Sequence, residues 1–157
     1  MSGLEREAGI IELTNCITSE RRLYSVQMTD EPRNPPESID YAHRALRTAK
    51  LAFDDGDWVG AINRAYYAIF YAANAVLELE GLQRSKHSQV LSVFRQQYVK
   101  TGKIEVEYSD IYGQAFKSRN EGDYERTLFP QRVEAERAID GARRFVERIE
   151  KLLREPK

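Results

Sequence analysis

The fold is decided by residues 57–81, which read DWVGAINRAYYAIFYAANAVLELEG. Apolar residues recur there every three to four positions, which is the spacing of one helix face. They are Trp58, Ile62, Ala65, Tyr66, Ile69, Ala73, Val76 and Leu77. The apolar surface continues around the cylinder through Tyr67, Phe70, Tyr71 and Asn74. We therefore expect this helix to lie at the centre of the fold, or to face both a core and a partner chain.

The same stretch carries signals for both helix ends. Asp57 is a residue type that caps helix N-termini, and Gly81 tolerates the left-handed backbone that often ends a helix. The predicted helix covers residues 57–80.

Two more helices are predicted on either side of this central one. The first begins at Ser38 as its N-cap, shortly after Pro36, and ends at Gly56. The second is shorter, covers residues 87–99 and has Ser85 as a candidate cap.

Two later segments complete the predicted fold. Residues 106–118 have helical spacing, and Gly122 is expected to interrupt them. The last helix is expected to start near Pro130, where a missing N–H costs nothing, and to carry an apolar stripe. The stripe consists of Ala135, Ala138, Ile139, Ala142, Val146, Ile149 and Leu153. Without any strand alternation, the sequence predicts an all-α fold: an antiparallel four- to five-helix up-and-down bundle.

Composition restricts the class of protein. The 157 residues suit one domain, with 24 Lys and Arg against 25 Asp and Glu, so global charge indicates no particular partner. Cys16 is the single cysteine, and no apolar run approaches the ~20 residues that a bilayer span needs. We expect a cytoplasmic location and no membrane. Residues 1–36 have linker composition and are expected to be a flexible extension of a bundle over 37–155, with Met28 as an alternative start to Met1.

A local basic run is the first candidate for function. Residues 81–104 contain no acid and five basic residues, namely Arg84, Lys86, Arg95, Lys100 and Lys103. They form either an ordinary solvated surface or a site for an anionic ligand such as RNA or a nucleotide. Within the run, His87 stands beside Lys86, whose charge is expected to keep the imidazole neutral. The alternative is that His87 only caps or packs the helix. Since no histidine has a ligand-spaced partner, we expect no metal and no cofactor.

The second candidate is FKSRNEGDY, residues 116–124. As a functional site, Arg119 would bind phosphate bidentately, Asn120 would orient a ribose or phosphate oxygen, and Tyr124 would donate a hydroxyl. As a structural feature, Arg119 would pair with Asp123 or Glu121 and nothing more would follow.

Together these segments resemble a known family. RAYYAIFYAANAVLELEGL (64–82), KHSQVLSVFRQQYVKTGKI (86–104) and FKSRNEGDY (116–124) are similar to the HEPN domain, and the likeness spans about residues 38–153. The branch that matches is a small prokaryotic one encoded beside a minimal nucleotidyltransferase. The resemblance implies a helical homodimer in a toxin–antitoxin-like module with that partner.

The resemblance also implies a chemistry. Active members cleave RNA without metal, using an arginine, a following polar residue and a later histidine in a composite site across the dimer. Arg119 and Asn120 match the start of that motif, whereas the position five residues after Arg119 holds Tyr124 in place of the histidine. A phenol with a pKa of about 10 is a poor base at neutral pH.

Three interpretations stay open for this departure. Tyr124 acts as an acid or hydrogen-bond donor; or His87 approaches Arg119 in the bundle and supplies the base; or the chain is a non-catalytic module that binds a nucleotide or partner. In the last case Tyr124 is a modified residue, because in related pairs the partner enzyme adenylylates a tyrosine near this motif. Lys86, Lys117 and Asp123 are the candidate substrate-binding residues.

Overall fold

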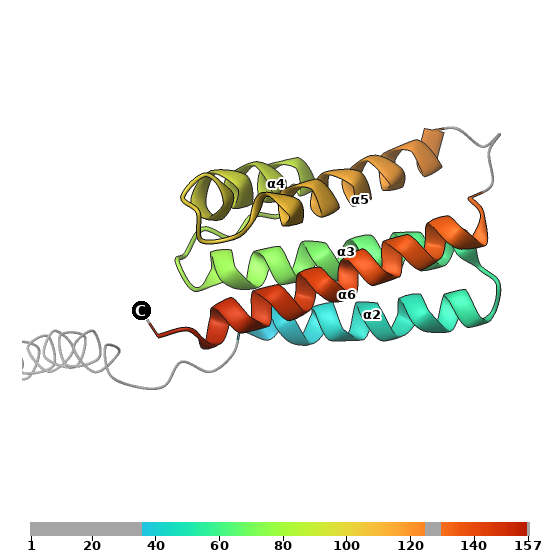
Figure 1. The fold of residues 1–157 in the computed structure, drawn as a ribbon, viewed down its shortest axis with the longest axis horizontal. Helices are drawn as coiled ribbons and strands as arrows, with labels where there is room; N and C mark the ends of the chain where they lie inside the picture. Colours follow the sequence, from blue (N-terminus) through green and yellow to red (C-terminus); the bar gives the residue numbers. More distant parts are fainter. Residues whose placement is uncertain (1–35, 125–129, 157) are drawn as a thin grey trace, which may run out of the picture. The chain divides into compact units, whose positions relative to one another are not determined.

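The protein is an all-helical bundle. The computed structural model describes the backbone of residues 36–124 and 130–156, and the side chains of residues 36–120 and 130–156. Within these ranges there is no strand (Figure 1). The helices are α2 (Glu37–Asp54), α3 (Trp58–Glu78), α4 (His87–Phe94), the π-helical η1 (Arg95–Val99), α5 (Val106–Tyr124) and α6 (Arg132–Arg154). The predicted all-α class is confirmed. Residues 1–35 of the predicted extension, including both candidate starts, lie outside the described residues.

The four long helices α2, α3, α5 and α6 run in alternating directions, as expected for an up-and-down bundle (Figure 1). Helix α3 packs against all the other α-helices, namely α2, α4, α5 and α6. The prediction that residues 57–80 form the central helix is therefore confirmed. The short α4 and η1 connect α3 to α5 on the side of α3 that lies away from α2 (Figure 1).

The core is built around the apolar surface of α3. Alanines alternate with large side chains along this helix, so that neighbouring helices approach closely while Tyr66, Ile69 and Leu77 are almost completely buried. Each large side chain of this kind stabilises the fold by ~1.5–3 kcal/mol relative to exposure. Most of the predicted apolar stripe of α6 packs onto this core. Its buried members are Ala135, Ala142, Val146 and Ile149.

The predicted N-cap of α3 is correct, whereas the helix ends at Glu78, two residues before the predicted end. Asp57 is the N-cap, and its Oδ1 accepts a hydrogen bond from the Gly60 amide at 2.8 Å. Gly81 follows the helix with a φ of +68°, and this turn lets the Leu82 amide donate to the Leu77 carbonyl at 2.8 Å.

The predicted caps of α2 and α4 are wrong. Pro36 occupies the N-cap position of α2, and the Ser38 hydroxyl instead donates to Glu78 Oε2 at 2.8 Å, which ties α2 to α3. Helix α4 has Lys86 as its N-cap, without a side-chain hydrogen bond, so Ser85 does not cap it. Ser38 lies two residues after the N-cap position of α2, and Ser85 lies one residue before that of α4, so neither hydroxyl is placed to cap the free amides.

The last helix also starts later than predicted. Helix α6 begins at Arg132, two residues beyond Pro130, because Gln131 and Glu134 form a capping box. The Gln131 amide donates to Glu134 Oε2 at 2.6 Å. These reciprocal hydrogen bonds satisfy amides that a helix otherwise leaves free at its first turn.

The predicted helix over 87–99 changes its winding half-way. From Arg95 the chain becomes π-helical, a rare geometry that shifts the direction of the following side chains. Arg95 turns inward, and its Nε donates to Ser109 Oγ at 2.9 Å. Gly113 leaves room for this guanidinium, because a Cβ there would lie 2.7 Å from Arg95 Nη2. Tyr98 donates its hydroxyl to the Val76 carbonyl at 2.8 Å.

Two buried tyrosines offer a matched test of this packing. Replacing Tyr98 with phenylalanine removes a buried hydrogen bond to Val76 and should cost about 1 kcal/mol of unfolding free energy. The Tyr112 hydroxyl is buried beside the Tyr66 hydroxyl and forms no hydrogen bond of ordinary geometry with a described residue. Tyr112→Phe should therefore leave stability unchanged or raise it. Urea unfolding of both variants makes the comparison, and an equal loss in Tyr112→Phe would show that its hydroxyl does have a partner.

Candidate functional site

The segment 116–124 forms the end of a helix. Helix α5 continues from Val106 to Tyr124 and passes through Gly122, so the predicted interruption after Ser118 is wrong. A glycine inside a helix costs only about 1 kcal/mol relative to alanine, which is small enough for the helix to continue. The helical backbone gives Tyr112, Phe116 and Arg119 a common face, because residues three and four apart lie one above another.

Arg119 lies over the tyrosine pair of the central helix. Its Cζ atom is 5.2 Å from the ring centroid of Tyr66 and 5.6 Å from that of Tyr67, within the range of cation–π attraction. The side chain is half-buried and forms no ion pair with any described side chain. Glu121 and Asp123, its predicted alternative partners, have side chains outside the described set. A guanidinium without a described counter-ion is suited to bind an anion.

His87 reaches the same tyrosine from another helix. It is the first residue of α4, and its ring stacks on Phe70 with centroids 4.4 Å apart and planes 20° apart. Its Nδ1 lies 2.6 Å from the hydroxyl oxygen of Tyr66. Tyr66 thus contacts both His87 and Arg119, and these three residues are called the tyrosine-linked site below.

Tyr66 was not among the predicted site residues. The sequence pattern placed it on the apolar face of the central helix, which is correct because the residue is fully buried. A buried phenol nevertheless needs a hydrogen-bond partner, and that requirement was the available signal. The partner, His87, is 21 residues away in sequence, and only the packing of α4 on α3 identifies it.

Burial and the charge of Arg119 set the protonation states. Burial raises the pKa of Tyr66 to about 12, although the nearby Arg119 opposes the shift, so the phenol stays protonated at neutral pH. Burial lowers the pKa of His87, and the charge of Arg119 lowers it further. The predicted neutral imidazole therefore agrees with the direction of this shift. The causes differ from the prediction, which named the neighbouring Lys86.

The remaining predicted site residues are less closely gathered. Lys86 and Lys117 are exposed, and Asn120 is half-buried one position beyond Arg119. The backbones of Asp123 and Tyr124 lie in the last turn of α5, but their side chains are outside the described set. Of the predicted site residues, the structure brings His87 and Arg119 together on Tyr66.

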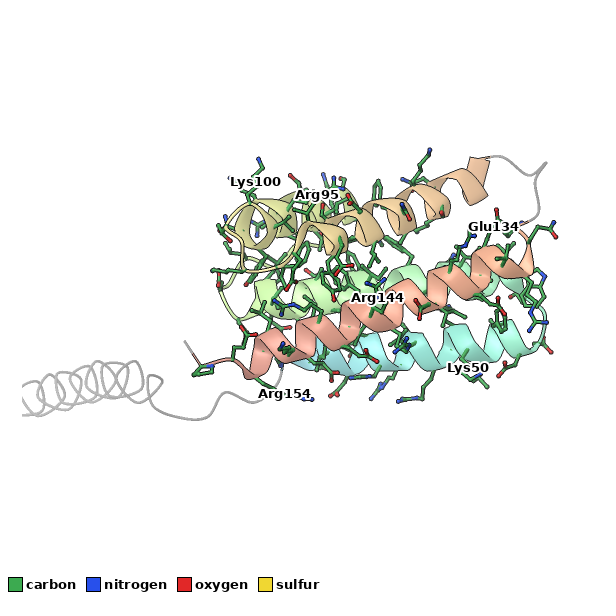
Figure 2. All side chains as sticks on the ribbon, in the orientation of Figure 1. Lys50, Arg95, Lys100, Glu134, Arg144 and Arg154 are labelled. Atoms are coloured by element: carbon green, nitrogen blue, oxygen red, sulfur yellow. The ribbon has the colours of Figure 1, made fainter. Side chains whose placement is uncertain are left out.

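Several cations of the basic run 81–104 have partners within the fold. Arg95 turns inward to Ser109, Lys103 lies 3.8 Å from Glu80, and Arg84 donates to backbone carbonyls of its own loop. Lys100 remains at the surface (Figure 2). Within the described ranges, no three His, Cys, Asp or Glu side chains are placed to share a metal ion.

The tyrosine-linked site combines a titratable ring with a fixed positive charge. When Nδ1 of His87 carries the proton and donates it to the Tyr66 oxygen, Nε2 has a free lone pair and can accept a proton. When the phenol donates to Nδ1, Nε2 carries a proton and acts as a donor. Arg119 can stabilise negative charge that develops nearby. The arrangement is therefore suited to proton transfer beside an anionic group.

The shifted pKa of His87 predicts a pH dependence of stability. The folded state lowers this pKa from 6.5, so the unfolded chain binds more protons just below that value. The contribution of neutral His87 is fully present above pH ~6.5 and is lost as the pH falls toward the folded pKa. Urea unfolding over this range should show a smaller dependence on pH in His87→Gln than in the wild type. Identical slopes for the two proteins would contradict the shift.

Comparison with known proteins identifies the family. The family model of the HEPN domain matches residues 36–152, most of the chain. The chain belongs to the HEPN family. The resemblance stated from the sequence, over about residues 38–153, is thereby confirmed, and the tyrosine-linked site lies within the matched HEPN region.

Relatives of this HEPN chain come from bacteria and archaea. A UPF0332 protein of Thermotoga maritima is 38% identical over 116 residues, covering 74% of this chain and 88% of the relative. Two proteins of Methanocaldococcus jannaschii, both named as putative toxins, are also similar. One is 38% identical over 117 residues, which is 74% of this chain and 87% of the relative. The other is 28% identical over 115 residues, which is 73% of this chain and 78% of the relative. Among the described residues, no helix has the length and apolar character that crossing a membrane requires.

Proposed function

We propose that this HEPN chain is the toxin-like member of a toxin–antitoxin-like module and that it cleaves RNA without a metal ion. The toxin role is supported by the family and by the names of the relatives from Methanocaldococcus jannaschii. The cleavage chemistry rests on a single observation, the hydrogen bond of 2.6 Å between Tyr66 and His87 on the same tyrosine that Arg119 contacts. His87 takes the place of the motif histidine that Tyr124 replaces.

In the proposed reaction the ribose 2′-hydroxyl attacks the adjacent phosphate. Nε2 of His87 accepts the hydroxyl proton, with Nδ1–H donating to the Tyr66 oxygen. Arg119 stabilises the charge that develops on the phosphoryl oxygens. The bond from phosphorus to the 5′-oxygen breaks, and that oxygen takes up the proton from the imidazolium or from water. The products are a 2′,3′-cyclic phosphate and a 5′-hydroxyl, and no external reactant is consumed.

The other proposed site residues have supporting roles. Asn120 orients the phosphate or ribose, while Lys86, next to His87, and Lys117, two residues before Arg119, attract the RNA backbone. Asp123 contributes to substrate binding from the last turn of α5. The module includes a second copy of this chain and a nucleotidyltransferase partner, as the family resemblance implies.

A second candidate function is a binding module without catalysis. The observation that favours it is Tyr124 at the position of the motif histidine, near the end of α5. In this case the nucleotidyltransferase adenylylates Tyr124 and thereby controls binding. Co-expression of the two proteins followed by mass spectrometry tests this candidate. An intact protein mass without added adenylate, and no modified peptide containing Tyr124, would remove it.

Labelled RNA and EDTA provide the test of the leading proposal. The purified wild type should cleave the RNA in the presence of EDTA and leave 2′,3′-cyclic phosphate ends. The same RNA with 2′-O-methyl groups should stay intact, because the attacking hydroxyl is blocked. Wild-type protein that binds the RNA without cleaving it would contradict the nuclease and favour the binding module.

A further inference from the structure

Three tyrosines form a continuous row that ends at the tyrosine-linked site. The rings of Tyr41 on α2 and Tyr71 on α3 contact each other with centroids 5.6 Å apart. Tyr71 contacts Tyr67 with centroids 6.0 Å apart, and Tyr67 meets the ring of His87 edge to face at 5.7 Å. We call Tyr41, Tyr71 and Tyr67 the tyrosine row. It leads from α2 across the central helix to the proposed base.

The tyrosine row is accessible although it borders the core. Tyr41 is 42% exposed, and Tyr67 and Tyr71 are half-buried. Helices α4 and α5 lie on the side of α3 away from α2, and no extensive contact joins α2 to either of them (Figure 1). One carboxylate approaches the row, because Glu37 Oε1 accepts a hydrogen bond from the Tyr41 hydroxyl at 3.0 Å. This contact is at the hydroxyl of Tyr41, and the Arg44 guanidinium lies over one face of the ring.

Positive charge accompanies the row along its length. The Cζ atom of Arg44 lies 5.6 Å from the ring centroid of Tyr41, and that of Arg64 lies 5.8 Å from the centroid of Tyr67. Arg119 contacts Tyr67, at the end of the row that meets the tyrosine-linked site. None of these three arginines forms an ion pair with a described side chain. Aromatic rings and arginine side chains therefore lie next to one another along the row.

We propose that the tyrosine row is a base-stacking surface for single-stranded RNA that leads the strand to the tyrosine-linked site. The proposal rests on the proposed function, since it names where that site's substrate is held. Aromatic side chains that stack on bases, next to cations that track the backbone, are the common means of binding single strands. In a duplex the base faces are occupied by neighbouring pairs, so the row selects unpaired RNA.

Binding to RNA that cannot be cleaved tests the row separately from catalysis. The probe is a short fluorescein-labelled 2′-O-methyl RNA, single-stranded or annealed to its complement, and the readout is fluorescence anisotropy with the full chain. Tyr41→Ala should weaken binding of the single strand about 5- to 150-fold, the range for loss of one stacked base. Tyr41→Phe, which keeps the ring, should bind like the wild type. Arg44→Ala should lower the slope of log affinity against log salt by about one.

Leu51→Ala is the matched control, because Leu51 is also on α2 and is 69% exposed. It should bind both probes as the wild type does. Tyr41→Ala should leave the weaker binding of the duplex unchanged. The proposal is overturned if Tyr41→Ala binds the single strand with wild-type affinity. It is also overturned if the substitution lowers the affinity for single strand and duplex by the same factor.

The outcomes separate this proposal from the proposed nuclease. Tyrosine-dependent binding of the uncleavable strand, without cleavage of ordinary RNA, keeps the row and removes the nuclease. Cleavage of ordinary RNA with normal binding by Tyr41→Ala keeps the nuclease and removes the row. Sedimentation of the same variants gives a third outcome. If Tyr41→Ala dissociates a dimer without changing RNA affinity, a second copy covers the row and the proposal is wrong.

Discussion

His87→Ala is expected to lower the rate of RNA cleavage by about 10²- to 10⁴-fold, the usual contribution of a general base. The imidazole is held by a hydrogen bond of 2.6 Å to Tyr66 and by stacking on Phe70, so alanine removes a positioned group that solvent cannot replace. Single-turnover cleavage of labelled RNA in EDTA measures the chemical step. Binding of the uncleavable 2′-O-methyl strand should be retained.

His43→Ala is the control for this prediction. His43 is on α2, where its Nε2 lies 2.8 Å from Glu150 Oε1, and it has no part in the tyrosine-linked site. Its replacement should leave cleavage unchanged. Full activity in His87→Ala would assign the base to another group and would end the case for His87 as the replacement of the motif histidine.

Arg119→Ala is expected to lower cleavage by about 10²- to 10³-fold, as removal of one charge-stabilising donor group usually does. Arg119→Lys should recover only part of the rate, because an ammonium group cannot bind phosphate through two parallel N–H donors. Both variants should fold, since the side chain is only half-buried and forms no described ion pair. Circular dichroism and urea unfolding check that expectation.

Arg47→Ala is the matched control for the loss of one positive charge. Arg47 is exposed on α2 and takes part in no described contact of the site. If Arg47→Ala and Arg119→Ala reduce cleavage equally, the effect is one of overall charge on RNA attraction. A large loss confined to Arg119→Ala supports a specific role beside the phosphate.

The bundle could be predicted because each of its helices is indicated by residues close together in the sequence. The apolar girth of residues 57–80 indicated a central helix, and Asp57 and Gly81 marked its ends through backbone requirements that are local. The errors also have local causes. Gly122 predicts an interruption of the helix, but α5 continues through it, because the free-energy cost of one glycine in a helix is small.

The site could be predicted only in part, because its residues meet through packing. His87 and Arg119 were named from sequence, but their connection through Tyr66 depends on how α4 and α5 lie against α3. Charge patterning was misleading for a related reason. The basic run is continuous in sequence, whereas in the fold Arg95 turns inward and donates to Ser109. Sequence spacing alone does not show which cations find internal partners.

The coupling of His87 to Arg119 and Tyr66 is tested most directly by NMR titration of the two histidines, with His43→Gln used to assign the signals. We expect His87 to titrate below its ordinary value of 6.5, since burial and Arg119 both lower its pKa. Arg119→Ala should raise this pKa, Tyr66→Phe should change the ring's tautomer signals, and Arg47→Ala should do neither. A His87 that titrates at its ordinary value in the wild type, and identically in all three variants, would contradict the existence of the tyrosine-linked site.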